Sequence, residues 1–164
     1  MANKAISTLA VGSSVYLNVG GARKEFLVVH QGKPSSLYDA SCEGTWLLMK
    51  DIFEATRWHS SDVNNLENST IHSILNSTLL NAFESNIRDA IKQVKLPYRK
   101  NGGSGGSDQS GANGLLCKIF LLSVIYISLI SVFPRLFTVK EALAFPPVAV
   151  GWIPRRSIVF STLA

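Results

Sequence analysis

Three histidines and two cysteines are the side chains of this 164-residue chain that are most able to do chemistry. They are His30, His59, His72, Cys42 and Cys117. No histidine stands at a His-x-x-x-His or His-x-x-Glu spacing, and the cysteines form no close pair, whereas a metal site needs ligands at such intervals. The sequence therefore predicts no metal site and no bound cofactor.

The same residues also fail to form a nucleophilic site. Cys117 could pair with a distant histidine, but nothing local activates its thiol. The serines lack the sharp strand-to-helix turn that exposes a hydrolase nucleophile. We therefore expect no catalytic residue and no enzymatic activity. Cys42 and Cys117 are expected to be free thiols, with a single disulfide between them as the alternative.

Two tryptophans could instead bind a ligand, because aromatic faces suit the C–H-rich surfaces of sugars. Trp46 lies in the apolar run 45–50, which favours a position in the core. Trp58 is followed by polar residues and is the one candidate ligand-binding residue, although an anchoring role in the core is favoured for it too.

Residues 68–94 show the clearest periodicity in the chain, because apolar residues recur at steps of three and four, as on one face of a helix. These residues are Ile71, Ile74, Leu75, Leu79, Leu80, Phe83, Ile87, Ala90, Ile91 and Val94. Asn68 and Ser69 are good N-caps for the first helix. Asn76 predicts that this helix ends and another begins, and Ser85 could cap a third piece. We expect two or three short helices that share one apolar face.

Several residues of this region and of the neighbouring segments are predicted to be structural. The polar ones are expected to be helix caps and buried hydrogen-bonding groups, and the aromatic ones core anchors. The full set is Trp46, Trp58, Asn68, Ser69, His72, Asn76 and Phe83.

The first fifty residues predict a β-hairpin and a third strand. Residues 14–19 and 24–30 flank Gly20-Gly21, a turn signal because both glycines can adopt positive φ. Residues 26–29 are apolar at consecutive positions, so both faces of this strand should be covered. Residues 45–50 form the third strand. The fold class is therefore α+β, with a hairpin and strand packed on a cluster of short helices.

The composition divides the chain into four parts. Residues 1–100 form the N-terminal half of the α+β domain, and residues 101–114 are a Gly/Ser-rich flexible loop without the Gly-Lys-Ser/Thr ending of a phosphate loop. Residues 115–123 are an apolar strand of the same domain. Residues 124–164 are a hydrophobic, basic tail.

The net charge of +5 does not predict a nucleic-acid partner. Residues 1–123 contain 12 Lys/Arg and 10 Asp/Glu, a surplus of two, whereas residues 124–164 contain four basic residues and one acid, a surplus of three. Nucleic-acid binding needs clustered basic residues on one face. Much of the charge lies in the tail instead, so we expect no nucleic acid.

Residues 115–133 could cross a membrane, because these 19 residues carry one charge, Lys118, and a spanning helix needs about 20 predominantly apolar residues. Their β-branched and aromatic residues suit a buried strand equally well. The alternative interpretation is a small single-pass membrane protein with a soluble domain at residues 1–114. Its C-terminus would be inside, because most of the nearby basic residues follow the segment. The start of the chain lacks the apolar core of a signal peptide, which favours a cytoplasmic protein.

Five segments together resemble an uncharacterised domain family of Gram-positive gut bacteria and their prophages. The segments are Thr45–Met49, Trp58–Asn64, Asn68–Asn76, Ile87–Arg99 and Lys118–Ser123. The resemblance covers about residues 5–123 in order and spacing. Family members continue through a Trp-Trp-Leu-Arg-Ser-Pro motif into a glycine-rich sheet, and this second half is similar to C-type-lectin-like and sulfatase-modifying folds.

The resemblance implies a function as well as a fold. Such modules occur in phage tail and cell-surface proteins, so this chain is expected to be a fragment of a non-enzymatic binding module with an incomplete C-type-lectin-like domain. The partner of complete relatives would be a surface glycan or a protein, and the location virion-associated or cytoplasmic.

The downstream motif is absent here, and residues 124–164 match nothing in the family. We expect this tail to come from a shifted reading frame or a truncated copy, and the ligand site to be missing. A sheet left without its later strands would expose an edge, which predicts poor solubility.

Overall fold

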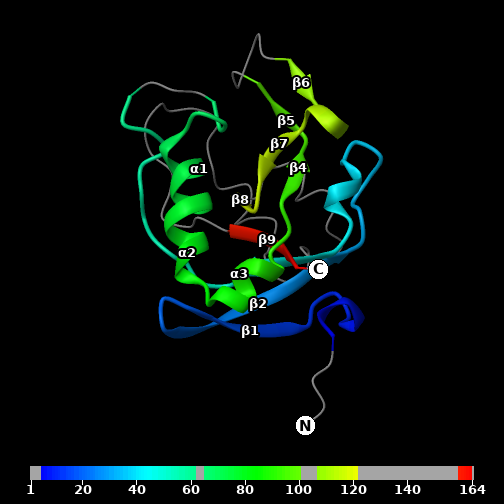
Figure 1. Cartoon of the computed structure of the whole chain (residues 1–164), viewed down its shortest axis with the longest axis vertical. Helices are drawn as coiled ribbons and strands as arrows, with labels where there is room; N and C mark the ends of the chain where they lie inside the picture. Colours follow the sequence, from blue (N-terminus) through cyan, green and yellow to red (C-terminus); the bar gives the residue numbers. More distant parts are fainter. Residues whose placement is uncertain (1–4, 62–64, 101–106, 122–158, 164) are drawn as a thin grey trace, which may run out of the picture.

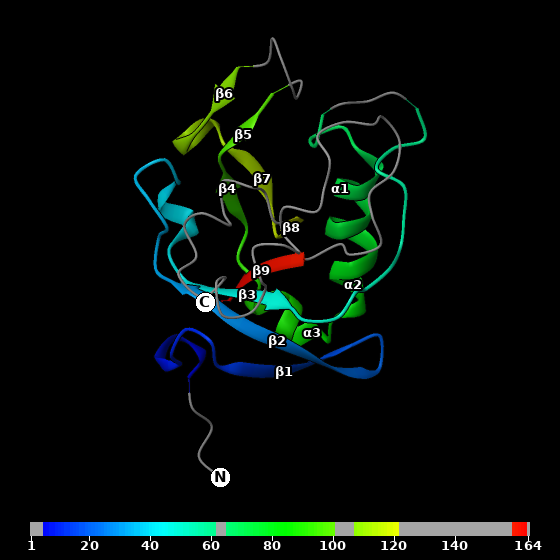
Figure 2. The same cartoon turned by 180° about the vertical axis from the view of Figure 1, so that it is seen from behind.

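The computed structural model describes residues 5–61, 65–100, 107–121 and 159–163. It confirms the mixed α+β class, because an antiparallel sheet packs against one short helical run. Figure 1 shows strands β1 and β2 at the bottom, helices α1 and α2 at one side and the small strands β5 and β6 at the top. Figure 2 shows the same arrangement from behind.

The predicted hairpin and third strand are present. Strand β1 (Ser14–Val19) pairs with β2 (Ala22–Gln31), and β2 pairs with β3 (Thr45–Met49), both antiparallel. Gly20 and Gly21 have φ values of +58° and +76°, as a two-residue hairpin turn of the favoured hand requires. The turn follows directly from the glycine pair in the sequence.

The main sheet has five strands in the order β1-β2-β3-β9-β8. Strand β9 (Val159–Leu163) comes from the end of the chain and lies between β3 and β8 (Ile119–Leu121), antiparallel to both. Ser161 at its centre lies opposite Leu47 of β3 and Ile119 of β8. The sequence predicts that the sheet begun by the first three strands exposes an edge, but backbone of the tail pairs with β3.

The helical region differs from the prediction at both its middle and its end. Helix α1 (Thr70–Ile74), a π-helical segment η3 (Leu75–Leu79) and α2 (Leu80–Ala82) follow one another without a break, so the predicted end at Asn76 is wrong. Helix α3 (Ser85–Ala90) ends four residues before Val94, where the sequence predicts the helical region to end. Val94 is instead the first residue of strand β4, and its partner lies far away in the sequence.

Two small sheets complete the described fold. Strand β4 (Val94–Leu96) pairs with β7 (Leu115–Cys117), and β5 (Tyr98–Arg99) pairs with β6 (Asp108–Gln109). The described residues also form three 3-10 turns: η1 (Ile6–Thr8) before β1, η2 (Ala40–Cys42) between β2 and β3, and η4 (Gly111–Asn113) between β6 and β7. The described end of the predicted flexible loop, residues 107–114, thus holds a strand and a turn. The single strand predicted at 115–123 is two strands in two sheets, separated at Lys118.

The first residues of the predicted membrane segment are not helical, because Leu115–Cys117 and Ile119–Leu121 form the strands β7 and β8. Residues 122–133 of that segment, like most of the predicted tail, lie outside the described residues. Among the helices in the described ranges, none is long and apolar enough to cross a membrane.

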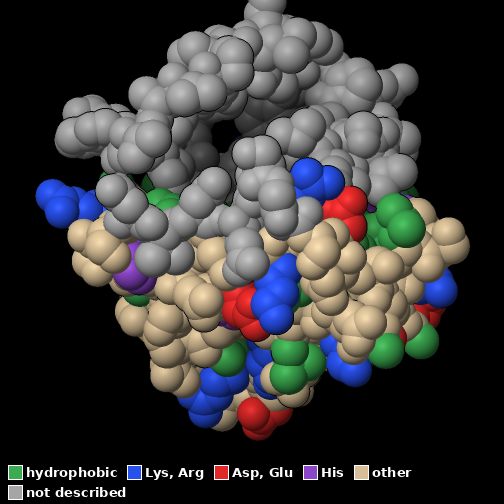
Figure 3. Space-filling model, turned by 90° about the horizontal axis from the view of Figure 1, so that it is seen from above, with side chains coloured by type: hydrophobic (Ala, Val, Ile, Leu, Met, Phe, Trp, Pro, Cys, Tyr) green, Lys and Arg blue, Asp and Glu red, His purple; other side chains and the backbone are tan. Residues whose placement is uncertain are grey.

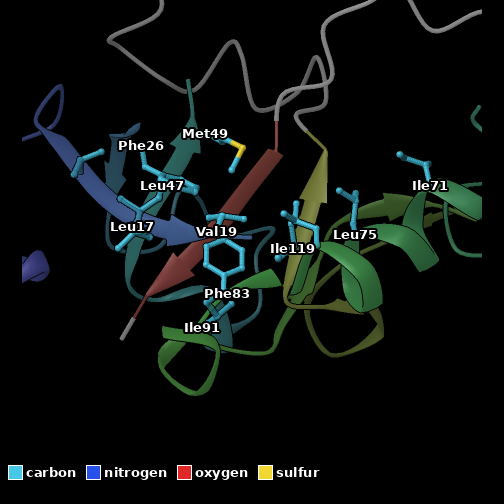
Figure 4. Close-up of a cluster of buried hydrophobic side chains, with 12 residues drawn as sticks. Leu17, Val19, Phe26, Leu47, Met49, Ile71, Leu75, Phe83, Ile91 and Ile119 are labelled. Carbon is cyan, nitrogen blue, oxygen red and sulfur yellow. The ribbon is translucent and has the colours of Figure 1, made fainter. Parts of the chain in front are cut away.

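Both faces of the sheet are buried, as the run of apolar residues in β2 predicts. Phe26 and Val28 pack with the helices in one cluster, and Leu27 and Val29 pack under η2, β4 and β7 in the other. Figure 4 shows the first cluster, in which the ring of Phe83 lies in the middle, beside Val19. Alternate residues of one strand therefore tie the helices and the small sheets to the same framework.

We predict that a Ser161→Pro substitution destabilises the protein, because proline removes a backbone N–H from a strand with neighbours on both sides. The expected loss is about 2 kcal/mol or more in urea unfolding. Ser161→Ala keeps the N–H and serves as the control, with unfolding close to that of the unchanged protein. Equal midpoints for the two variants would show that β9 contributes nothing to the sheet.

Candidate ligand-binding site

A long irregular segment joins β3 to α1 and is the most unusual connection in the described fold. Residues 50–69 contain no strand or helix among those that the structure describes, and 62–64 lie outside them. Connections of this length inside a compact domain commonly carry function. We call this segment the 50–69 loop.

The loop is attached to the helix and the core at defined points. The half-buried Trp58 packs against the helix-side core, and its carbonyl accepts a hydrogen bond from the backbone N–H of Ile71 at 3.1 Å. Asn65 is buried, and its Oδ1 accepts the backbone N–H of Glu67 at 2.9 Å. These contacts give the described part of the loop a fixed course at the start of α1.

Ser69 is the N-cap of α1, whereas Asn68 is exposed in the preceding turn. The Ser69 Oγ accepts the N–H of His72 at 3.2 Å and donates to the carbonyl of Leu66 at 2.7 Å. Together with the carbonyl of Trp58, it satisfies N–H groups that the first turn of a helix otherwise leaves unpaired. The cap therefore joins the loop to the helix at one buried residue.

Two polar side chains from separate elements meet near this cap, and His72 follows the cap on α1. The hydroxyl of Tyr98, on β5, donates to Oε2 of Glu67 at 3.1 Å. Partial burial and the neighbouring Glu67 carboxylate raise the pKa of Tyr98. Burial lowers the pKa of His72, and the charge of Glu67 partly opposes this effect. Glu67 thus bonds the hydroxyl of Tyr98 and acts electrostatically on the ring of His72. We call Trp58, Glu67, His72 and Tyr98 the loop site.

His59 adds a hydrogen-bond donor next to Trp58. Its Nδ1 lies within hydrogen-bonding distance of the backbone N–H and the carbonyl of Ser61, at 3.1 and 3.3 Å, so Ser61 fixes the orientation of the ring. Aromatic faces, a carboxylate and a ring N–H are the groups that hold a ligand rich in C–H and O–H bonds. The loop site has the chemistry of reversible binding to such a ligand.

Two aromatic residues singled out by the sequence lie in the core and not at this site. Trp46 is 1% exposed, and its indole N–H is within bonding distance of the carbonyls of Gly32 and Cys42, at 3.0 and 3.2 Å. Phe83 is buried beside Phe26, with ring centroids 6.0 Å apart. Both residues are part of the core.

Asn76 also has a structural position, at the contact between η3 and β8. Its Oδ1 accepts the backbone N–H groups of Lys118 and Ile119, at 2.7 and 3.1 Å. Its Nδ2 donates to the carbonyls of Ile119 and His72, at 2.9 and 3.0 Å. The carboxamide therefore joins the helix to the sheet.

The two cysteines are free and buried, and a strand separates them. The thiol of Cys42 donates to the carbonyl of Lys95 at 3.3 Å, on the edge of β4 that faces η2. Cys117 lies on β7, opposite Val94 on the other edge of β4. The structure thus holds both cysteines as free thiols, with no disulfide between them.

Charged groups on the described surface are mixed in sign. In Figure 3, basic and acidic side chains lie next to one another on the visible face and do not gather by sign. Two ion pairs illustrate this, Lys50 with Glu25 and Arg99 with Asp108, each at 2.8 Å. Within the described residues, no three His, Cys, Asp or Glu side chains are grouped so that they could hold a metal ion.

Glu67 and Tyr98 were not recognised from the sequence. Their contact joins residues 31 positions apart, and neither residue belongs to a local motif. Asn65 was missed for a similar reason, because its burial comes from the course of the loop. The length of the polar segment before Asn68 is the one sequence signal that could have drawn attention to this region.

The chain belongs to the family of DUF6273, a domain of unknown function whose sequence model matches residues 43–132. The matched region contains β3, the whole 50–69 loop, the helices and the small sheets, but not the N-terminal hairpin. It extends past Ser123, where the resemblance drawn from the sequence ends. No curated protein and no solved structure matches the chain.

We predict that both thiols of the folded protein react slowly with a disulfide reagent at neutral pH. Burial raises the pKa of Cys42 and raises that of Cys117 to about 12, so little thiolate forms. Reaction should become rapid in guanidinium chloride. Fast labelling of two thiols per chain without denaturant would contradict this burial.

We also predict that stability decreases as the pH falls below about 6.5, the ordinary pKa of histidine. The pKa of His72 is lower than this in the folded state, so the unfolded chain takes up the proton first and becomes favoured. The melting temperature should be compared at neutral pH and at an acidic pH that still lies above the pKa values of the carboxyl groups. The melting temperature of His72→Gln should fall less between these two conditions than that of the unchanged protein. Ser73→Ala changes an exposed residue on the same helix, and its melting temperature should fall as much as that of the unchanged protein. An equal fall in the two variants would show that His72 is not the group responsible.

Proposed function

We propose that this chain is a non-enzymatic binding module that recognises a surface glycan, and that the loop site contacts the ligand. The observation that carries the proposal is the hydrogen bond between Tyr98 and Glu67 at the end of the 50–69 loop, the loop that also holds Trp58 beside the start of α1. These three side chains come from two distant parts of the sequence. They combine an aromatic surface with hydrogen-bonding groups.

The anchoring of the loop supports a binding role. A ligand site loses less entropy on binding when its groups are already ordered. Here the backbone of Glu67 is held by Asn65, and that of Trp58 by Ile71. The polar groups of the site are thereby arranged before a ligand arrives.

The setting of this function is also a proposal. The resemblance to prophage and cell-surface modules suggests a phage tail or cell-surface protein, with a glycan of a cell surface as the target. The loop site lies wholly within the part of the chain that the family model matches.

Glycan-array binding by the full chain tests the proposal. Trp58→Ala should weaken binding about tenfold through loss of aromatic contact, and Tyr98→Phe should weaken it severalfold because the hydroxyl that orients Glu67 is gone. Melting curves of each variant separate a loss of binding from a loss of folding, which matters because Trp58 packs on the core.

Tyr16→Ala is the matched control, because Tyr16 is a 50% exposed aromatic residue on β1, outside the loop site. Its binding should equal that of the unchanged protein. The absence of binding to any glycan, or an equal loss in the Tyr16 variant, would overturn the assignment of the loop site.

A further inference from the structure

We infer that Glu67 is the polar anchor of the loop site and that it selects uncharged sugars with two neighbouring hydroxyl groups over anionic sugars. This inference rests on the proposed function and specifies the class of ligand. It depends on how Glu67 is held, on which of its oxygens are engaged and on the charge around it.

The backbone and one oxygen of Glu67 are fixed by its neighbours. The backbone N–H donates to Oδ1 of Asn65, a side chain that is only 7% exposed. Oε2 accepts the hydroxyl of Tyr98 at 3.1 Å. A buried amide on one side and a tyrosine on the other thus orient a carboxylate that itself lies on the exposed surface.

The second oxygen of the carboxylate is open. Oε1 of Glu67 has no hydrogen-bond partner among the residues that the structure describes. An ionised carboxylate accepts hydrogen bonds at both oxygens and donates none. It therefore matches a ligand that presents O–H donors, and two neighbouring hydroxyls of a sugar ring can reach both oxygens together.

The charge around Glu67 is not neutralised by an ion pair. Glu67 forms no salt bridge with any Lys or Arg of the described ranges. Arg99, which follows Tyr98 on β5, is held by Asp108 through two bonds of 2.8 and 3.1 Å. The guanidinium of Arg99 is therefore engaged by Asp108 and does not neutralise Glu67. The carboxylate of an anionic sugar would be repelled by the carboxylate of Glu67 at close range.

The test compares neutral oligosaccharides with uronate oligosaccharides of the same length on one array, using the full chain. The unchanged protein should bind at least one neutral glycan about tenfold more tightly than its uronate counterpart. Glu67→Gln should weaken the neutral complex about tenfold, because hydrogen bonds to a charged acceptor are the stronger kind. It should also bring the two affinities close together.

Glu54→Gln is the matched control, since Glu54 is an exposed carboxylate of the same loop with no hydrogen bond to the loop site. It should preserve both the affinity and the discrimination. Equal affinities of the unchanged protein for neutral and uronate glycans would overturn this inference alone. So would unchanged glycan binding by Glu67→Gln in combination with no binding by Trp58→Ala. Failure to bind any glycan would overturn the proposed function itself.

Discussion

The carboxamide of Asn76 closes an edge of the main sheet, and the position of the helices depends on it. Strand β8 pairs with β9 on one side. On its other side, the N–H and carbonyl of Ile119 bond the Asn76 side chain at 3.1 and 2.9 Å, where a neighbouring strand would otherwise be needed. A buried backbone group without a partner costs free energy, so this one side chain both satisfies the strand and fixes the helix beside it.

This connection extends to the loop site. Asn76 lies in the π-helical segment η3, and π-helical turns often occur where a helix serves a function. The same helical run begins at Ser69, which caps it and holds the end of the 50–69 loop. Apolar contacts of Leu75 with the helix-side core reinforce the attachment. The loop is therefore positioned by a helix that is itself bonded to the sheet.

Local patterns in the sequence were sufficient for the elements that depend on neighbouring residues. The pair Gly20-Gly21 predicts the hairpin, the apolar run in β2 predicts burial on both faces, and Ser69 is a recognisable cap. Contacts between distant residues explain what was missed. Asn76 resembles a helix end locally, but its partners are 42 and 43 residues away. Val94 fits the helical pattern, yet it pairs with Cys117 in a strand.

Amide hydrogen exchange at Lys118 and Ile119 tests the central role of Asn76 most directly. In an Asn76→Ala variant, protection at these two amides should fall about tenfold or more, because their acceptor has been removed. Val28, in the middle of β2, should lose less protection. Asn81→Ala, an exposed change on α2, should alter neither site. Unchanged exchange at Lys118 and Ile119 in the Asn76 variant would contradict the account.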